Sequence, residues 1–129
     1  MEYADPELRI AEWLNAQLDA KCHADPDLTP YLPFREPLGH VQRSPGEGDT
    51  RLSLDSVILD IDWYAELADH ARDYAQRTWS LMRLTLPQYT WDDGVNVNGV
   101  QTLSAPYWGP ATGTYRRSAA YRVFLHGVI

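Results

Sequence analysis

The spacing of apolar residues changes from a period of two to a helical period within residues 52–86. Residues 57–62 read Val-Ile-Leu-Asp-Ile-Asp, an alternation that is typical of a strand with one buried face. The earlier apolar positions, Leu52 and Leu54, fall out of step with this alternation. A change of parity moves side chains to the opposite face of a strand, so the pattern predicts a β-bulge near Asp55-Ser56.

The next segment has the apolar spacing of an amphipathic helix over residues 63–86. Asp62 precedes it, and its carboxylate is expected to cap the free N–H groups of the first turn. Pro87 is expected to end the helix. The apolar stripe, which should lie across a sheet, consists of Ala65, Ala68, Ala71, Ala75, Trp79, Met82 and Leu86.

A first helix is predicted over residues 6–21. Asp5-Pro6 is a typical cap and first helical position, and Ile10, Leu14 and Leu18 follow at intervals of four. Residues 22–38 contain four prolines, which favour extended and turn conformations, so this segment is predicted to be an irregular connector.

The remaining segments are predicted to form two hairpins. Residues 39–62 contain a weak strand, a turn-rich tip and the alternating strand described above. The tip consists of Pro45, Gly46, Glu47, Gly48 and Asp49. Residues 95–127 contain Asn98-Gly99, a strong hairpin signal, a loop over 106–113 and a long final strand.

This order of elements predicts one α+β domain spanning residues 1–129, with two main helices packed on a mostly antiparallel sheet of four to five strands. The formal net charge of −7 argues against a general binder of nucleic-acid backbones or anionic membranes. The single cysteine, Cys22, excludes an internal disulfide. No apolar run approaches the length of a membrane span, so the sequence predicts a soluble protein made in the cytoplasm.

No cofactor, metal or catalytic site is predicted. The four histidines are scattered without the spacing of metal ligands, and no glycine-rich phosphate loop or nucleophile elbow occurs. Asp60 and Asp62 share one strand face and Asp92-Asp93 lie in a loop, so a carboxylate site is conceivable. The simpler interpretation is that Asp62 caps the helix and Asp60 lies at the solvent-exposed edge of the sheet.

Fifteen aromatic residues are many for a chain of 129. Tyr107 and Trp108 lie in the predicted Pro/Gly-rich loop rather than on a periodic face. Aromatic residues in such loops often anchor interfaces, because they bury a large area at low entropic cost. The alternative is that they fold back over the core of their own domain.

The linear arrangement resembles the tail terminator proteins of long-tailed bacteriophages. The resemblance extends from a proline-rich lead-in at residues 32–39 to the closing strand, and its short phrases are DIDWYA at 60–65, LSAPYW at 103–108 and YRVFL at 121–125. The chain departs from the family in having the single glycine Gly39, where relatives often carry a pair, and in the additional tryptophans Trp13 and Trp91.

The resemblance implies a tail-terminator-like fold and a structural protein, not an enzyme. Such proteins form a homo-oligomeric ring, commonly a hexamer, which caps the tail tube, ends its polymerisation and joins the tail to the head-side connector or stopper protein. DNA would pass through the lumen without specific binding, and the protein would lie at the head-proximal end of the virion tail. Candidate subunit or tube contacts are the tip Pro45–Asp49, Tyr107 and Trp108.

Three other interpretations stay open at this point. The protein could be another head-to-tail adaptor, such as a neck or stopper protein. It could be an enzyme in which Asp60, Asp62 or Asp92 binds a divalent metal. It could also be a ligand-binding module with tryptophans lining a groove.

Overall fold

The computed structural model describes residues 5–25, 27–32, 36–44 and 54–126. Its five strands form one mixed sheet of order β1-β2-β3-β5-β4, in which β1 and β2 are parallel and the other neighbours are antiparallel. This is the predicted α+β class. The elements are α1 (Pro6–Leu18), β1 (Lys21–His23), η1 (Thr29–Tyr31), β2 (Leu38–Arg43), β3 (Leu54–Ala65), α2 (Ala68–Ser80), η2 (Leu81–Thr85), β4 (Asn96–Gly109) and β5 (Tyr115–His126).

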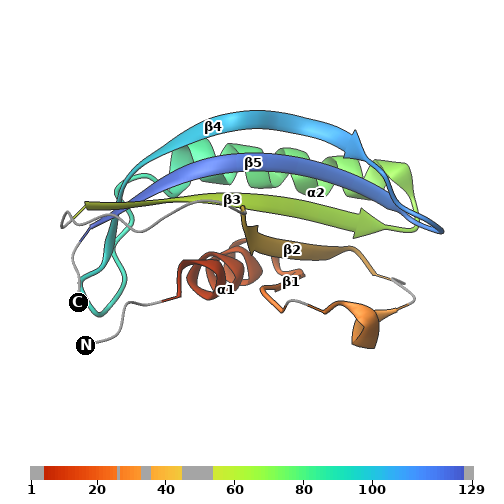
Figure 1. Ribbon diagram of the computed structural model, residues 1–129, viewed down its shortest axis with the longest axis horizontal. Helices are drawn as coiled ribbons and strands as arrows, with labels where there is room; N and C mark the ends of the chain where they lie inside the picture. Colours follow the sequence, from red (N-terminus) through yellow and green to blue (C-terminus); the bar gives the residue numbers. More distant parts are fainter. Residues whose placement is uncertain (1–4, 26, 33–35, 45–53, 127–129) are drawn as a thin grey trace.

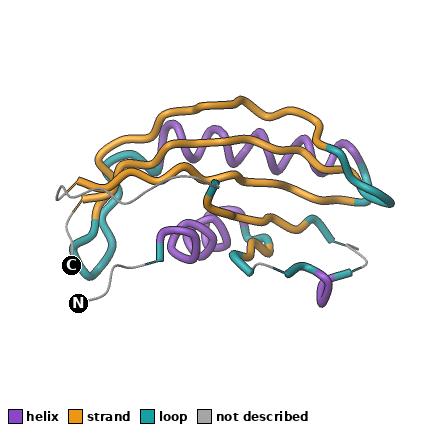
Figure 2. Tube along the Cα trace, viewed as in Figure 1, coloured by secondary structure: helices purple, strands orange, loops and turns teal. Residues whose placement is uncertain are grey.

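Both helices pack on one face of the sheet. Alternate residues of β3, namely Leu59, Ile61 and Trp63, share a single buried cluster with residues of α1 and of α2. In Figures 1 and 2, α2 runs behind β3, β5 and β4, whereas α1 lies beside β2. Within the described residues, neither α1 nor α2 covers the opposite face of the sheet, and the 3-10 helix η1 reaches that face only at its β1 edge, where Tyr31 stacks on His23.

The first helix begins as predicted. The Asp5 carboxylate accepts hydrogen bonds from the backbone N–H groups of Glu7 and Leu8, and Pro6 occupies the first turn. The helix ends at Leu18, three residues earlier than predicted, because Asp19 adopts a left-handed conformation (φ 51°). This reversal of the backbone directs the chain into β1.

Strand β1 (Lys21–His23) begins on the last residue of the predicted first helix and continues into the segment 22–38, which was predicted to be an irregular connector. It is three residues long and pairs with β2 on one side. On the other side, the Asn15 side chain accepts a hydrogen bond from the Cys22 N–H and donates one to the Cys22 carbonyl at 3.1 Å. One amide side chain thus satisfies backbone groups that a further strand would otherwise pair.

The predicted 39–62 hairpin is confirmed, since β2 and β3 are antiparallel neighbours. The bulge predicted near Asp55-Ser56 is wrong. These residues pair regularly with Leu125 and Phe124 of β5, so an uninterrupted partner strand holds the register. The tip of the hairpin lies outside the described residues.

The second helix begins at Ala68, not at residue 63. Strand β3 continues through Ala65, which pairs with Tyr115 of β5, and the sheet therefore takes the residues that the helical pattern had assigned to the first turn. The predicted Asp62 cap is consequently wrong, and Leu67 occupies the cap position without a side-chain hydrogen bond. The helix continues from Ser80 into the π-helical segment η2.

The Asn98-Gly99 hairpin predicted within residues 95–127 is also wrong. Both residues lie inside β4, where a register shift between Val97 and Gly99 leaves Asn98 without a partner on β5. The turn between β4 and β5 instead spans residues 110–114, with Gly113 at φ 73°. The first half of the loop predicted at 106–113 is therefore strand, and its second half belongs to the turn.

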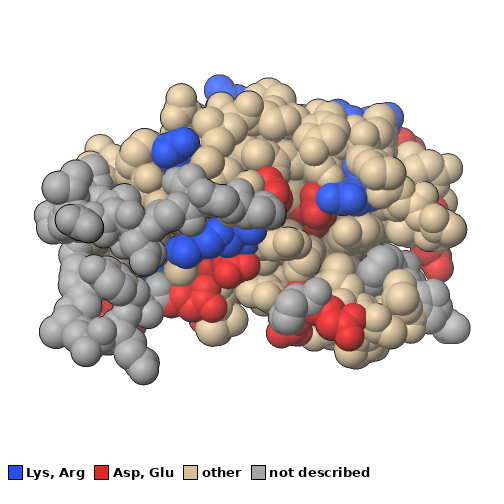
Figure 3. All heavy atoms as spheres, viewed as in Figure 1, with Lys and Arg blue, Asp and Glu red and all other residues tan. Residues whose placement is uncertain are grey.

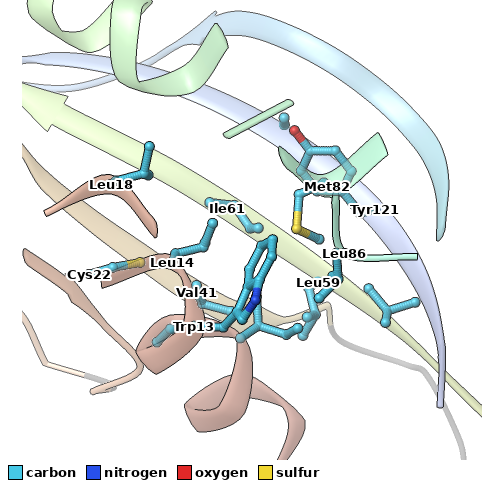
Figure 4. Close-up of a cluster of buried hydrophobic side chains, with 14 of the residues drawn as sticks. Trp13, Leu14, Leu18, Cys22, Val41, Leu59, Ile61, Met82, Leu86 and Tyr121 are labelled. Carbon is cyan, nitrogen blue, oxygen red and sulfur yellow. The ribbon is translucent and has the colours of Figure 1, made fainter. Parts of the chain in front are cut away.

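The core is continuous across the helical face of the sheet, from α1 to α2. Figure 4 shows Trp13 of α1 pointing toward Leu59 and Ile61, with Met82, Leu86 and Tyr121 on the far side of these residues. Trp63 is fully buried, and its indole N–H donates to the Thr78 hydroxyl of α2 at 2.8 Å. Its ring also stacks on Tyr74 at 4.9 Å between centroids.

Gly39 is the position at which the core is most sensitive to added volume. A methyl group there would lie 2.9 Å from Cys22 Sγ and 2.9 Å from two ring atoms of Trp63. We expect Gly39→Ala to lower the free energy of unfolding by ~1–3 kcal/mol, as overpacking typically does. Urea unfolding at 25 °C measures this, with Gly99→Ala as the matched strand control, since its methyl group would meet only Phe124 at 3.8 Å. Equal losses in both variants would show that close packing at Gly39 is unimportant.

Candidate assembly surfaces

Of the predicted contact residues, the structure describes Tyr107 and Trp108 but not the hairpin tip. Tyr107 and Trp108 lie near the end of β4, with exposed fractions of 50 % and 42 %. The prediction that they lie in a loop is therefore wrong, and so is the alternative in which they fold back over the core. The tip Pro45–Asp49 lies outside the described residues.

Four exposed apolar side chains gather where β3 ends, β4 ends and β5 begins. Tyr115 begins β5 and is 50 % exposed, while Leu67 follows the end of β3 and is 57 % exposed. Tyr115 lies next to Trp108, with ring centroids 6.1 Å apart. We call this group the aromatic end, defined as Leu67, Tyr107, Trp108 and Tyr115. It lies at the right of Figure 1.

Tyr107 and Trp108 are consecutive strand residues, so their side chains project from opposite faces of the sheet. Tyr107 pairs with Ser118 and lies close enough to Arg116 for the two side chains to interact electrostatically. Both lie on the face of the sheet that α1 and α2 leave uncovered, which we call the helix-free face. Trp108 lies on the helical side, where Arg72 of α2 reaches its ring. The aromatic end therefore presents apolar surface on both sides of the sheet.

Two arginines flank Trp108. The Arg117 guanidinium lies 4.7 Å from the ring centroid and that of Arg72 lies 5.5 Å away. Such cation–π contacts hold an exposed indole in place. Arg72 also pairs with Asp69 at 3.1 Å, whereas Arg117 has no carboxylate partner within the described residues. Arg117 thus contributes a positive charge at the aromatic end.

β4 forms the long outer edge of the sheet, and its backbone geometry limits how a partner can use it. The register shifts at three places along the strand, and Pro106 removes one N–H donor. Bulges and prolines on an edge strand discourage pairing with a strand of another molecule. The side chains of the aromatic end are therefore better suited to contact a partner than the β4 backbone is.

The helix-free face contains an ion pair. Asp62 is only 4 % exposed, and its Oδ2 accepts a hydrogen bond from Arg116 at 3.2 Å. Its Oδ1 is buried without a described partner. Loss of one member of such a pair leaves an uncompensated buried charge, so Arg116 and Asp62 depend on each other.

Neighbouring groups on this face have shifted pKa values. Burial, followed by repulsion from Asp62, raises the pKa of the Asp60 carboxyl, although the Arg116 charge opposes the shift. Burial and the same Asp62 charge raise the pKa of Tyr64. The face therefore carries more negative potential than Arg116 neutralises.

The residues of the metal-enzyme alternative are not brought together as a ligand set. Asp62 is engaged by Arg116, and Asp92 lies in the turn that precedes β4. His40 Nε2 lies 2.7 Å from the Asp25 carbonyl, and His23 stacks on Tyr31. Among the residues described, no group of three or more His, Cys, Asp or Glu side chains could hold a metal ion.

Comparison with known proteins identifies no family. Neither a scan against protein-family models nor a search of curated proteins finds a match. Within the described residues, no helix is both long and apolar enough to cross a membrane. The function must therefore be inferred from the geometry of the chain itself.

Sequence reasoning missed Leu67, Tyr115, Arg72 and Arg117 as members of this surface. For Tyr115 and Arg117 the signal is their distance from the turn, since they follow Gly113 by two and four residues. Residues on both sides of a hairpin turn lie together, so a turn placed at 110–114 would bring them near Trp108. Leu67 and Arg72 carry no such signal, and only the docking of α2 brings Arg72 to Trp108.

The raised pKa of Asp60 predicts a pH-dependent effect on stability. Burial in the folded state disfavours the ionised Asp60 carboxylate, which lowers the free energy of unfolding. This destabilisation is absent below the unfolded pKa of 3.8 and develops as pH rises from that value through the folded pKa. We expect Asp60→Asn to raise the melting temperature at pH 7, with an advantage that shrinks as pH falls toward 3.

Asp93 provides a control of opposite sign. A hydrogen bond from Arg9, together with the Val95 N–H, lowers the pKa of Asp93. Its stabilising contribution is present above pH 3.8 and is lost as pH falls through the lower folded pKa. Asp93→Asn should therefore lower the melting temperature at pH 7. Thermal scans from pH 3 to 7 measure both variants, and a decrease for Asp60→Asn at pH 7 would contradict the assignment.

Proposed function

We propose that this protein is a self-assembling structural subunit of the phage tail terminator type, which forms a ring on the end of a tail tube. The observation that carries the proposal is the aromatic end, where four large apolar side chains remain exposed at one extremity of the sheet. Aromatic residues that are exposed together and flanked by arginine are characteristic of the central contacts of protein interfaces.

The helix-free face gives a second argument. The α-helices cover only one side of the sheet, and the other side carries the partly buried Asp60 and Arg116 together with the buried Asp62. A surface of this composition is suited to a polar contact with a partner or to the wall of a water-filled channel. A net charge of −7 per subunit would also discourage DNA from adhering to such a channel.

In this function the protein performs no chemical step. Its partners would be further copies of itself, the tail tube protein, and the head-side connector or stopper protein. Heterologous contacts between copies close into a ring when the rotation between neighbours divides a full turn. Assembly of this kind would end tube growth by covering the surface to which the next tube ring would bind.

The decisive experiment measures mass and tube capping together. Light scattering over a concentration series should reveal a species whose mass is a whole multiple of the monomer, and electron microscopy with purified tail tubes should show a ring on one tube end. A protein that stays monomeric at every concentration and leaves tube ends bare would contradict the proposal.

Tyr107 provides a variant with a defined effect. Its removal in Tyr107→Ser should cost about 2 kcal/mol of association energy, a roughly thirtyfold weaker association, as is typical of an interface aromatic anchor. The control is Leu84→Ser, which removes an apolar side chain that is 76 % exposed and lies on η2, outside the aromatic end. Light scattering should separate the two variants while their melting temperatures stay similar. Equal assembly by both would exclude Tyr107 from the interface.

A further inference from the structure

An acidic hollow lies between α1 and the turn that precedes β4. Its volume is about 340 Å³, which is enough for an aromatic side chain. Leu8 contributes an exposed apolar surface to it. The lining residues are Asp5, Leu8, Arg9, Glu12 and Trp91.

The one cation of this lining is already engaged. Arg9 donates two hydrogen bonds to the Asp93 carboxylate, and its guanidinium lies 5.2 Å from the Trp91 ring centroid. Glu12 is exposed and has no cationic partner within the part of the chain described. Asp5, whose carboxylate also caps α1, adds a second negative charge to the lining. In Figure 3, acidic side chains gather over α1, and basic side chains border them. The hollow therefore combines an apolar wall with unneutralised negative charge.

The aromatic end has the complementary character. It presents Tyr107, Trp108 and Tyr115 as apolar surface, and Arg117 adds a positive charge that no described carboxylate neutralises. The Arg117 Nε is buried without a hydrogen-bond partner in the described structure. An aromatic and basic surface is thus complementary in charge and in apolar character to the acidic hollow.

The two surfaces lie at opposite ends of the molecule. Trp91 bonds to Val95 just before β4 begins, whereas Trp108 lies at the other end of the same strand. A strand rises about 3.3 Å per residue, so the surfaces are on the order of 35–40 Å apart. The aromatic end cannot reach the hollow of its own chain, and the two can meet only between copies.

We propose that the aromatic end of one copy docks in the acidic hollow of the next copy. This inference rests on the proposed self-assembly and specifies the contact that drives it. Because two different patches meet, the interface is heterologous, and its repetition gives a ring or an open helix. Arg117 lies opposite Glu12 across this interface.

Charge reversal tests this arrangement. Arg117→Glu and Glu12→Arg should each raise the protein concentration at the midpoint of assembly by at least tenfold, because each places like charges across the contact. An equimolar mixture of the two variants should return to within threefold of the wild type. When the two variants alternate around the ring, every contact is either the original pair or the reversed pair, so alternating rings are favoured.

Controls separate this effect from folding and from net charge. Arg83→Glu reverses an exposed arginine that stacks on Trp79, away from the aromatic end, and should leave the midpoint within threefold of the wild type. Circular dichroism melting checks each variant. If Arg117→Glu unfolds, Arg72→Glu replaces it, since that more exposed guanidinium flanks the same Trp108 ring.

The outcomes distinguish this inference from the proposed function. If wild type assembles but neither reversal weakens assembly, the docking model is overturned and the proposed function stands. If both reversals weaken assembly and the mixture does not recover, the two patches do not meet each other, and the docking model is overturned. A wild type that never assembles would overturn both.

Discussion

The structure depends on the contact between Gly39 and Trp63. These residues face each other across β2 and β3, and the indole occupies the space that a side chain at position 39 would fill. The same ring donates to Thr78 and so fixes α2 on the sheet. Because Cys22 of β1 also contacts position 39, one glycine sets the spacing of β1, β2 and α2 together.

Packing both helices on one face has a consequence for the rest of the molecule. The core is closed on one side, and charged groups can occupy the other side of the same strands, where Asp62 pairs with Arg116. Such a pair is weak evidence for stability, since its desolvation offsets its attraction, but it fixes one arrangement of β3 against β5. Four of the apolar side chains that remain exposed lie together at one end of the sheet, where a neighbouring molecule can cover them.

The elements with strong local signals could be predicted from the sequence. Asp5-Pro6 and the apolar stripe of α1 fixed its start and its buried face, and alternation over 57–62 identified the buried face of β3. Prediction failed where two patterns competed for the same residues. Residues 63–65 fit the helix by spacing but belong to β3, because pairing with β5 satisfies their backbone groups.

The sequence by itself determined the α+β class, the capped first helix and the candidate pair Tyr107 and Trp108, because these follow from local spacing and turn chemistry. Only the tertiary structure decided that this pair ends a strand, that Arg72 and Arg117 flank the indole, and that the acidic hollow lies at the opposite end. The physical reason is that these relations join residues far apart in the chain. Their positions are set by sheet register and helix docking, which no local pattern encodes.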